Sequence, residues 1–511
     1  MTDWTAGYVA DIGYTFGYYQ ELNPMRIKLA FLDAGLVYPE VGVACELGFG
    51  QGLSVNVHAA ASMTSWHGTD FNPAQAGFAQ ELAHKSGASA QLVDQGFEDF
   101  CANDQLPEFD FIGLHGIWSW ISDANRAIIV DFIQRKLKVG GVLYISYNTQ
   151  PGWAAMVPMR NLLTQHSTVM GASGQGIVPR INASLDFAER LLATNPSYAK
   201  ANPQVAGRIA AIKGQNKNYV AHEYFNRDWQ PMSFAEMADW LAPTKLSYAC
   251  SAHLSDHVDA INLTAEQQSF LADIPDAVLR QSVRDFMVNQ QFRRDYWVKG
   301  ARTLTAFDRS QALRQQKILL TSHRHDIALK ITGNAGEIEM AAAIYNPILD
   351  LLADHQPKSL GQLEQALNQA GLGLGQIHQA VIILAGQGHI ALLQDDSIVA
   401  KAKKVSDKLN LHLIEKARSN SDVSTLASPV TGGGVAVGRF QQMFLLALRH
   451  GKKSPVDMAS FAWSILRSQG QKILKDGVVI ESDEGNIEEF THLSTIFFEK
   501  QLPILKALQI A

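Results

Sequence analysis

The sequence predicts an α/β fold whose centre is a parallel sheet, and two observations carry this prediction. First, an apolar strand over residues 41–46 ends in Glu46 and runs into three alternating glycines, Gly48, Gly50 and Gly52. Second, strand and helix patterns alternate up to about residue 150, which favours right-handed crossovers between parallel strands. The expected strands cover residues 41–46, 65–69, 89–93, 109–114 and 142–147, and the expected helices cover 53–61, 73–86 and 124–137.

The glycine run indicates a nucleoside-binding site. Glycine has no Cβ, so the backbone can turn sharply and lie against a ligand, and the amides of the following helix would face the same ligand. The dinucleotide fingerprint requires glycine at its sixth position, where this chain has Leu53. The spacing is instead G-x-G-x-G, with Glu46 before it and Asp70 at the end of the next strand. This pattern resembles the first motif of class I S-adenosylmethionine (SAM) methyltransferases; the alternative is an ordinary tight turn between a strand and a helix.

Composition restricts the classes of function. With 511 residues, the chain is expected to form about three to four domains. The net charge of -6 argues against a nucleic-acid partner and is compatible with a basic substrate. Three scattered cysteines without zinc spacing indicate reduced thiols in a cytosolic setting. Residues 1–19 lack a signal-peptide pattern and no apolar run is long enough to span a bilayer, so we expect a cytoplasmic protein without membrane insertion.

The chain divides into four expected regions. Residues 1–154 contain an aromatic N-terminal arm, a helix from Pro24 to Ala34 and the strand–helix alternation, in which residues 138–142 read as a turn. Packing is the expected role of the arm's aromatic residues, with a lid over the cofactor as the alternative. Residues 155–225 lose the strand pattern and read as a helical insertion that suits dimer contacts. Residues 226–325 return to mixed structure and could complete the sheet, and residues 326–511 form the C-terminal region.

The C-terminal region resembles a winged-helix module. Helices are expected over 337–352, 359–370 and 374–387, followed by a small hairpin over 388–393 and 397–401. The third of these helices has no Lys or Arg to meet phosphates, so a protein-interaction role is favoured over DNA binding. Residues 419–434 are rich in Ser, Thr and Gly and indicate a mobile loop, and the tail from Phe440 reads as helical.

Further motifs extend the resemblance over residues 10 to 320. They are His115-Gly-Ile-Trp118-Ser-Trp120, Ser146-Tyr147-Asn148-Thr-Gln-Pro151-Gly152-Trp153, His222-Glu223-Tyr224-Phe225-Asn226 and Phe292-Arg293-Arg294-Asp295. Together they resemble bacterial class I methyltransferases with a methyltransferase regulatory domain, a group that includes the rickettsial outer-membrane-protein lysine methyltransferases. The resemblance implies a Rossmann-like methyltransferase sheet, a helical dimerisation insertion, a middle domain and a mostly helical C-terminal domain. It also implies SAM as cofactor, protein lysine as acceptor and a homodimer.

The expected cofactor residues stand where strands of an open parallel sheet end, which is where such sheets bind ligands. The three glycines would pass under the methionine part and the sugar of SAM, and Asp70 would accept the ribose hydroxyls. Glu46 would orient the glycine loop and meet the cationic amino group through water, or act only as a buried structural carboxylate. The adenine would be flanked by Phe71 and met at its far edge by Phe97 and Glu98.

The expected acceptor residues follow the fourth and fifth strands. Methyl transfer is an in-line displacement that depends mostly on positioning, and a lysine acceptor must lose its proton first. An aromatic channel formed by Trp118, Tyr147 and Trp153 would favour the neutral amine and attract its methylated form, and Asn148 could accept a hydrogen bond from it. His115 is the candidate base, although a structural role is favoured for it.

Three functions remain open from the sequence. The first is a SAM-dependent methyltransferase that modifies protein lysine side chains, including those of outer-membrane or surface proteins. The second is a methyltransferase that modifies a small molecule, sugar or lipid. The third is a non-catalytic SAM-binding regulatory protein whose C-terminal module recruits a partner. A metal site is not expected, because the spacing of His222, His253 and His257 fits no compact ligand set.

Overall fold

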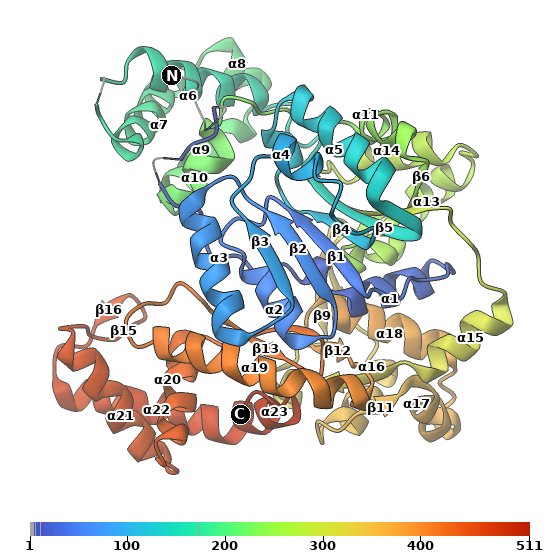
Figure 1. Ribbon diagram of the computed structural model, residues 1–511, viewed down its shortest axis with the longest axis vertical. Coiled ribbons are helices and arrows are strands. Elements are labelled where there is room, and N and C mark those ends of the chain that lie inside the picture. Colours follow the sequence, from blue (N-terminus) through green and yellow to red (C-terminus); the bar gives the residue numbers. More distant parts are fainter. Residues whose placement is uncertain (1–4, 6, 11, 173) are drawn as a thin grey trace.

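A seven-stranded sheet with the order β3-β2-β1-β4-β5-β7-β6 lies at the centre of the protein, in a computed structural model that describes residues 5, 7–10, 12–172 and 174–511 (Figure 1). Strands β1 to β5 pair in parallel, whereas β7 lies antiparallel between β5 and β6. The predicted α/β fold class with a mostly parallel sheet is therefore confirmed. The remaining residues of the N-terminal arm, 1–4, 6 and 11, lie outside the described part of the chain.

The first part of the chain follows the predicted alternation closely. Its strands are β1 (Val43–Leu47), β2 (Ser65–Thr69), β3 (Ala90–Val93), β4 (Phe109–Leu114) and β5 (Leu137–Asn148). Its helices are η1 (Gln20–Leu22), α1 (Pro24–Asp33), α2 (Leu53–Ala61), α3 (Pro73–Ser86), α4 (Phe97–Cys101), η2 (Trp118–Trp120) and α5 (Asp123–Lys136). The expected turn over residues 138–142 is wrong, because these residues form the irregular start of β5, with Gly140 at a φ of +82°.

Local chemistry explains why α3 has the bounds that the sequence predicts. Asn72 precedes the helix and its side-chain oxygen accepts hydrogen bonds from the backbone N–H groups of Ala74 and Gln75. Pro73 fills the first helical position, where its missing N–H costs nothing. Gly87 ends the helix with a φ of +70°, in the left-handed region that glycine adopts without strain. The helix is thereby fixed beside the glycine loop at one end and beside the C-terminal region at the other.

The helical insertion and the last two strands of the sheet come next along the chain. The insertion consists of α6 (Val157–Val169), α7 (Ile177–Ala193), α8 (Ser197–Ala201), α9 (Gln204–Gly214) and α10 (Lys217–Phe225). The following segment contains α11 (Phe234–Leu241), η3 (Ala242–Thr244), β6 (Leu246–Ser251), η4 (Leu254–His257), α12 (Asp259–Asn262), α13 (Ala265–Ala272), α14 (Ala277–Met287) and β7 (Phe292–Lys299). The boundaries drawn between domains stay predictions, but β6 and β7 belong to the same sheet as β1–β5.

The C-terminal region packs beneath the sheet in the view of Figure 1, with α19 along α2 and α3. Its first half contains α15 (Ala306–Gln315), β8 (Lys317–Leu320), η5 (Arg324–Asp326), β9 (Lys330–Gly333), β10 (Gly336–Glu339), α16 (Ala342–Leu352), β11 (Lys358–Ser359), α17 (Leu360–Leu367), η6 (Asn368–Ala370), α18 (Leu374–Gly386) and β12 (Ile390–Leu392). Its second half contains α19 (Asp396–Lys416), β13 (Thr425–Ser428), β14 (Gly433–Ala436), α20 (Arg439–Arg449), α21 (Pro455–Ser468), β15 (Leu474–Lys475), β16 (Val478–Val479), α22 (Asp483–Ile496), η7 (Phe497–Gln501) and α23 (Leu502–Ala507).

Three expectations for this region are wrong. The expected hairpin over 388–393 and 397–401 does not form, because β12 pairs with β8 and residues 396–416 form α19, whose buried residues recur at helical spacing. The expected helix over 337–352 begins later, because residues 336–339 pair with β9. The expected mobile loop over 419–434 contains β13 and the start of β14, a hairpin that contacts α2 and α19. Three helices and a three-stranded sheet are present, but the winged-helix assignment stays a prediction.

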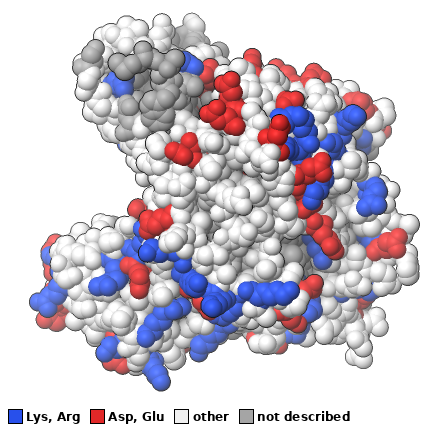
Figure 2. Space-filling model, in the orientation of Figure 1, with Lys and Arg blue, Asp and Glu red and all other residues white. Residues whose placement is uncertain are grey.

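Charge is unevenly distributed on the surface. Figure 2 shows Lys and Arg gathered along the lower part of one face, over α19. Lys401, Lys404 and Lys408 of this helix are exposed, and Lys85 at the end of α3 is exposed nearby. The net charge of -6 therefore coexists with a local basic strip, and the absence of a nucleic-acid partner stays a prediction. Across the described residues, none of the helices combines the length and the apolar composition that a bilayer crossing needs.

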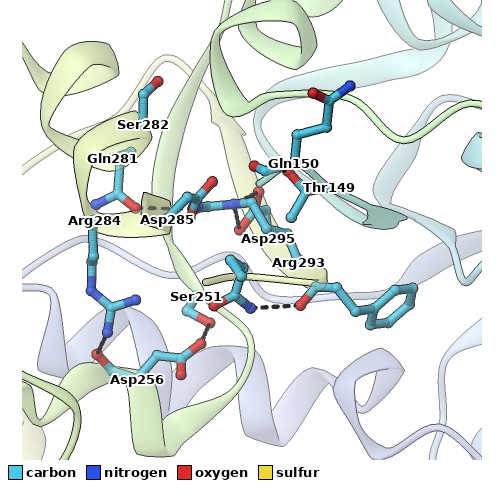
Figure 3. A network of polar contacts seen from close by, with 12 residues as sticks. Thr149, Gln150, Ser251, Asp256, Gln281, Ser282, Arg284, Asp285, Arg293 and Asp295 are labelled. Atoms are coloured by element: carbon cyan, nitrogen blue, oxygen red, sulfur yellow. Dashed lines mark hydrogen bonds and ion pairs between the residues drawn. The ribbon is translucent and has the colours of Figure 1, made fainter. Parts of the chain in front are cut away.

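A buried ion network ties β7 to the helix before it. Arg293 lies between Asp285 and Asp295, donating to Asp285 Oδ1 at 2.5 Å and to Asp295 Oδ2 at 2.9 Å (Figure 3). The guanidinium also donates to Gln281 Oε1 at 3.0 Å, and Tyr147 Oη donates to Asp295 Oδ2 at 3.0 Å. The three charged side chains are at most 5% exposed, so removing Arg293 would leave two buried carboxyl groups without a counter-ion.

We expect Arg293→Met to lower the free energy of unfolding by about 3–5 kcal/mol, because Asp285 and Asp295 would lose their buried counter-ion. Urea denaturation followed by tryptophan fluorescence would measure this change. Arg135→Met is the matched control: Arg135 is 39% exposed and pairs with Asp131, so its loss should cost less than about 1 kcal/mol. Equal effects of the two substitutions would contradict a structural role for the Arg293 network.

Candidate functional site

A cavity of about 290 Å³ lies at the carboxyl ends of the parallel strands. This end of the sheet is where open α/β folds bind ligands. We call it the cofactor cavity. The expected residues that line it are Glu46, Gly48, Gly50, Asp70, Phe71, Phe97, Glu98 and His115. The structure therefore brings most of the predicted cofactor residues to one place.

The glycine loop between β1 and α2 has the backbone conformation that its sequence demands. Gly48, Gly50 and Gly52 have φ values of +70°, +58° and +67°, in the region that favours glycine. The N–H of Gly48 donates to Thr69 O at 2.8 Å, which fixes the loop against the end of β2. Gly52 does not line the cavity; a Cβ there would lie 2.4 Å from the Cβ of Ala79, so this glycine serves the packing of α2 against α3.

Two buried carboxyl groups face the loop. Asp70 accepts the backbone N–H of Gly50 at 2.8 Å and that of Asn72 at 3.0 Å, and burial raises its pKa to about 6. Glu46 is 2% exposed, and burial, together with the charge of Asp70, raises its pKa to about 8. Within the described residues, Glu46 Oε2 has no hydrogen-bond partner. The pocket thus holds acceptor capacity that the protein itself does not satisfy, which fits a ligand with hydroxyl donors and a cationic group.

Aromatic residues of the N-terminal arm cover the cavity. Tyr8, Tyr14 and Tyr19 line it together with residues of the sheet. The ring of Tyr8 packs edge-on against Phe71 with 5.4 Å between centroids, and the ring of Tyr14 packs edge-on against Trp120 at 6.0 Å. The arm's aromatic side chains therefore pack, as expected, and also line the cavity, while a lid over the cofactor stays a prediction. In the sequence, the high density of tyrosines near the N-terminus is the feature that indicates these lining residues.

His115 stands at the end of β4 as a neutral, oriented imidazole. Its Nδ1 lies 2.8 Å from Tyr144 Oη, and its ring stacks on Tyr19 with 3.5 Å between centroids. Burial lowers its pKa to about 4, so the ring carries no charge near neutral pH. A group with so low a pKa is a weak base, which agrees with the structural role favoured from the sequence.

Four of the predicted acceptor residues do not line the cofactor cavity. Tyr147 is fully buried and bonded to Asp295, and Trp118 is fully buried, with its indole N–H directed at Met232 Sδ. Trp153 packs within the helical insertion, where the Arg208 guanidinium lies 3.9 Å from its ring centroid. Asn148 is buried, and its backbone N–H donates to Ser119 Oγ at 2.8 Å. Their expected placement around an acceptor channel beside the cofactor is therefore corrected.

Strand alternation explains the error on β5. Successive side chains of a strand point to opposite faces of the sheet. Tyr147 shares its face with Leu143 and Ile145, which pack in the core beneath α5. Tyr144 and Ser146 occupy the other face, where Tyr144 meets His115 and Ser146 Oγ accepts the N–H of Gly116 at 2.8 Å. Because alternate residues of a strand share a face, Tyr144 and Ser146 are the β5 residues that strand alternation predicts on the side of His115.

Other lining residues received no predicted role from the sequence. They include Gln51, Gln95, Ile117, Trp120, Ser122, Asn125 and Asp228. They come from turns and helix starts, where no periodic pattern marks a residue that faces a ligand. His222, singled out in a motif, packs against the rings of Tyr8 and Tyr14 with centroid distances of 5.1 and 5.0 Å. In the part of the chain that the structure describes, no group of His, Cys, Asp and Glu is placed to hold a metal ion.

Comparison with known proteins places the chain in a family. Residues 216–299 match the family model described as a predicted methyltransferase regulatory domain. The Synechocystis protein sll1526 is 38% identical over 99% of this chain and 100% of its own length. The chain belongs to the sll1526 family. The Rickettsia prowazekii protein RP789 is 27% identical over 54% of this chain and 49% of its own length.

Solved structures confirm the fold of this sll1526-family protein. PKMT2 from Rickettsia typhi, solved in complex with AdoHcy, superimposes with a TM-score of 0.69 at 17% identity, covering 97% of this chain and 99% of its own. A second structure of PKMT2 gives a TM-score of 0.66 at 18% identity. The predicted class I methyltransferase fold with a methyltransferase regulatory domain is confirmed.

We expect Glu46→Gln to reduce the pH dependence of stability. Burial raises the pKa of Glu46 from 4.5 to about 8, so its stabilising contribution is complete below pH 4.5 and is lost as pH rises through 8. This group alone lowers the free energy of unfolding by up to about 1.4 kcal/mol per pH unit between those values. Urea denaturation at pH 5.5 and pH 8 would measure the slope, and the exposed Glu40→Gln is the control. An unchanged slope in Glu46→Gln would contradict the raised pKa.

Proposed function

We propose that this protein transfers a methyl group from SAM to lysine side chains of other proteins. The observation that carries the proposal is the pairing of a glycine loop at positive φ with two buried carboxyl groups, Asp70 and Glu46, at the carboxyl ends of the sheet. Bound SAM supplies an activated methyl group on a sulfonium, and the protein supplies position and solvent exclusion. The class I methyltransferase fold supports the same reaction.

The cavity offers a matching group for each part of SAM. Each carboxylate oxygen of Asp70 accepts one backbone N–H and keeps a lone pair that could accept a ribose hydroxyl. Glu46, with an unsatisfied oxygen in the same pocket, would meet the cationic amino group directly or through water. Phe71 and Phe97 would pack against the adenine, and Glu98 would meet its edge. In this proposal, the cation of the ligand offsets the repulsion between the two carboxylates.

Lysine is the proposed acceptor for two reasons. The resemblance to the rickettsial lysine methyltransferases extends over the motifs quoted above, and the net charge of -6 suits a basic protein substrate. A neutral amine is itself a competent nucleophile, so the reaction needs no strong base, and His115 with its low pKa could not serve as one. A small-molecule, sugar or lipid acceptor, or SAM binding without turnover, would give different results in the experiment below.

The test is incubation of the purified protein with SAM labelled in its methyl group and two acceptor panels. Label on protein that is recovered as methyl-lysine after hydrolysis supports the proposal. Label in extract metabolites alone would replace lysine with a small acceptor, and binding without transfer would favour a regulatory protein. Failure to bind either SAM or S-adenosylhomocysteine would exclude all three functions.

We further propose that the protein acts in the cytoplasm as a homodimer that uses the helical insertion. Apolar side chains at the end of α6 support this proposal, since Val169 and Met170 are each 71% exposed. Sedimentation analysis of the full chain would test it, and a monomer at micromolar concentration would exclude it.

We expect Asp70→Ala to weaken SAM binding by about 1.5–3 kcal/mol, because one charge-assisted contact with the ribose is lost. Isothermal titration calorimetry would measure the change. Asp70→Asn should retain part of the affinity, since an amide oxygen still accepts one hydroxyl. The exposed Asp104→Ala, which makes the same change of charge away from the cavity, should bind SAM as the natural protein does. Equal affinity in Asp70→Ala and the natural protein would remove Asp70 from the ribose site.

A further inference from the structure

A second cavity, of about 770 Å³, adjoins the cofactor cavity. Two side chains whose rings stack, Tyr19 and His115, line both cavities, so the cavities meet at these residues. The walls of the second cavity come from the N-terminal arm, α1, β7 and the C-terminal region. We call it the interdomain cavity.

Direct transfer requires the nucleophile to lie about 3–3.5 Å from the methyl carbon, so the acceptor site must meet the cofactor cavity beside the methyl group. The interdomain cavity meets this condition at His115, on the side of β4 and the glycine loop, where the methionine part of SAM is proposed to lie. Two further cavities, of about 530 and 390 Å³, share no lining residue with the cofactor cavity. The cavity beside α6 shares only Thr5 and Tyr8 with it, next to Phe71 on the adenine side.

We propose that the interdomain cavity is the acceptor site and that it takes a long, unbranched side chain ending in an uncharged primary amine. This inference rests on the proposed function and names the place and the protonation state of the acceptor. Its geometric basis is the meeting of the two cavities at Tyr19 and His115, and its chemical basis is the set of charges around the interdomain cavity.

The charged side chains that line the interdomain cavity are two cations and one acid. Arg294 of β7 donates to Glu21 Oε1 at 2.9 Å, and Arg26 of α1 donates to Gln20 Oε1 at 3.2 Å. Glu21 is 5% exposed, and its pKa stays below the ordinary value because Arg26 and Arg294 outweigh the opposing effect of burial. The acid is therefore already compensated, and the lining carries one net positive charge.

The other lining groups add no charge. His115 is neutral, and burial raises the pKa of Tyr18 and Tyr19 to well above neutral pH. The C-terminal region contributes only uncharged residues, which are Thr321, Ser322, Ala385, Gly388, Ile390, Ala391, Leu392, Thr425, Thr431, Gly434, Val435 and Ala436. A net positive, partly dehydrated cavity opposes an ammonium ion and lowers the pKa of an entering amine.

This arrangement prepares the nucleophile without a basic side chain. The amine gives its proton to water before it enters, and its nitrogen lone pair then forms the new bond to the methyl carbon. The carbon–sulfur bond breaks and its electron pair stays on sulfur, which leaves S-adenosylhomocysteine and a methylated ammonium. That product leaves the positive cavity with its charge or loses a proton to water. Arg26 and Arg294 are positioning residues in this scheme, because they act on the amine through charge.

Three SAM analogues would test the proposal on the full chain. Each has nitrogen in place of sulfur, and that nitrogen carries a methyl, a butyl or a 4-aminobutyl group where SAM carries its methyl. We expect the butyl analogue to bind at least tenfold more tightly than the methyl analogue at pH 7.5. The 4-aminobutyl analogue should bind more weakly than the butyl analogue at pH 7.5 and gain about tenfold relative to it per pH unit up to pH 9, as its tail loses a proton.

Matched substitutions locate the tail. Ala391→Trp would fill the interdomain cavity and abolish the advantage of the butyl analogue, while the methyl analogue binds as before. Thr164→Trp would fill the cavity beside α6 and should change neither affinity. No advantage for the butyl tail, or an advantage lost in Thr164→Trp and kept in Ala391→Trp, would overturn the proposed site. Failure of the methyl analogue and of S-adenosylhomocysteine to bind would instead contradict the proposed function.

A second set of substitutions tests the charge. Arg294→Gln should reduce the pH dependence of the 4-aminobutyl analogue and strengthen its binding several-fold at pH 7.5, whereas Arg294→Lys should preserve the dependence. Lys404→Gln removes one positive charge from the exposed face of α19 and should have no effect. Unchanged affinity of the methyl analogue shows that each variant is folded. A 4-aminobutyl affinity that is independent of pH in the natural protein would overturn the uncharged-amine proposal.

Discussion

The candidate site depends on the burial of two carboxyl groups in one pocket whose described lining residues include no Lys or Arg. Asp70 fixes the glycine loop by accepting the N–H of Gly50, and Glu46 lies at the base of the same loop with one oxygen unsatisfied among the described residues. Each ionised form is costly in this setting, which is why the pKa values of both groups are raised. A ligand that brings hydroxyl donors and a cation would lower the free-energy cost of ionising both carboxyl groups. This gain would contribute to the affinity for such a ligand.

The N-terminal arm links this pocket to the rest of the molecule through consecutive side chains. Tyr18 Oη accepts the N–H of Gly434 at 2.7 Å, which ties the arm to the β13–β14 hairpin of the C-terminal region. The next residue, Tyr19, stacks on His115, and Glu21 pairs with Arg294 on β7. The four residues from Tyr18 to Glu21 thus contact the C-terminal region, the end of β4 and the internal strand β7.

The parts of the fold that the sequence predicts well are those fixed by local chemistry. α3 has its predicted bounds because Asn72, Pro73 and Gly87 each impose a backbone state, and Asp70 lies in the pocket because it follows a buried strand. The failures have a different physical origin. Residues 425–436 are rich in small and polar side chains, yet they form a buried hairpin because α2 and α19 cover it, a contact that local pattern does not encode. The prediction that Tyr147 faces the cofactor is wrong because the neighbouring positions on β5 point to the opposite face of the sheet. The interdomain cavity was not predictable, because its walls come from segments about 400 residues apart.

The regulatory-domain segment cannot be an independent module, because its last strand is an internal strand of the central sheet. β7 lies between β5 and β6, and neighbouring residues on it point to opposite faces. Arg293 anchors α14 through the buried network of Figure 3, while Arg294 reaches the interdomain cavity on the other side. A shift of α14 would therefore act on Arg293, and the next residue on the same strand, Arg294, lines the interdomain cavity.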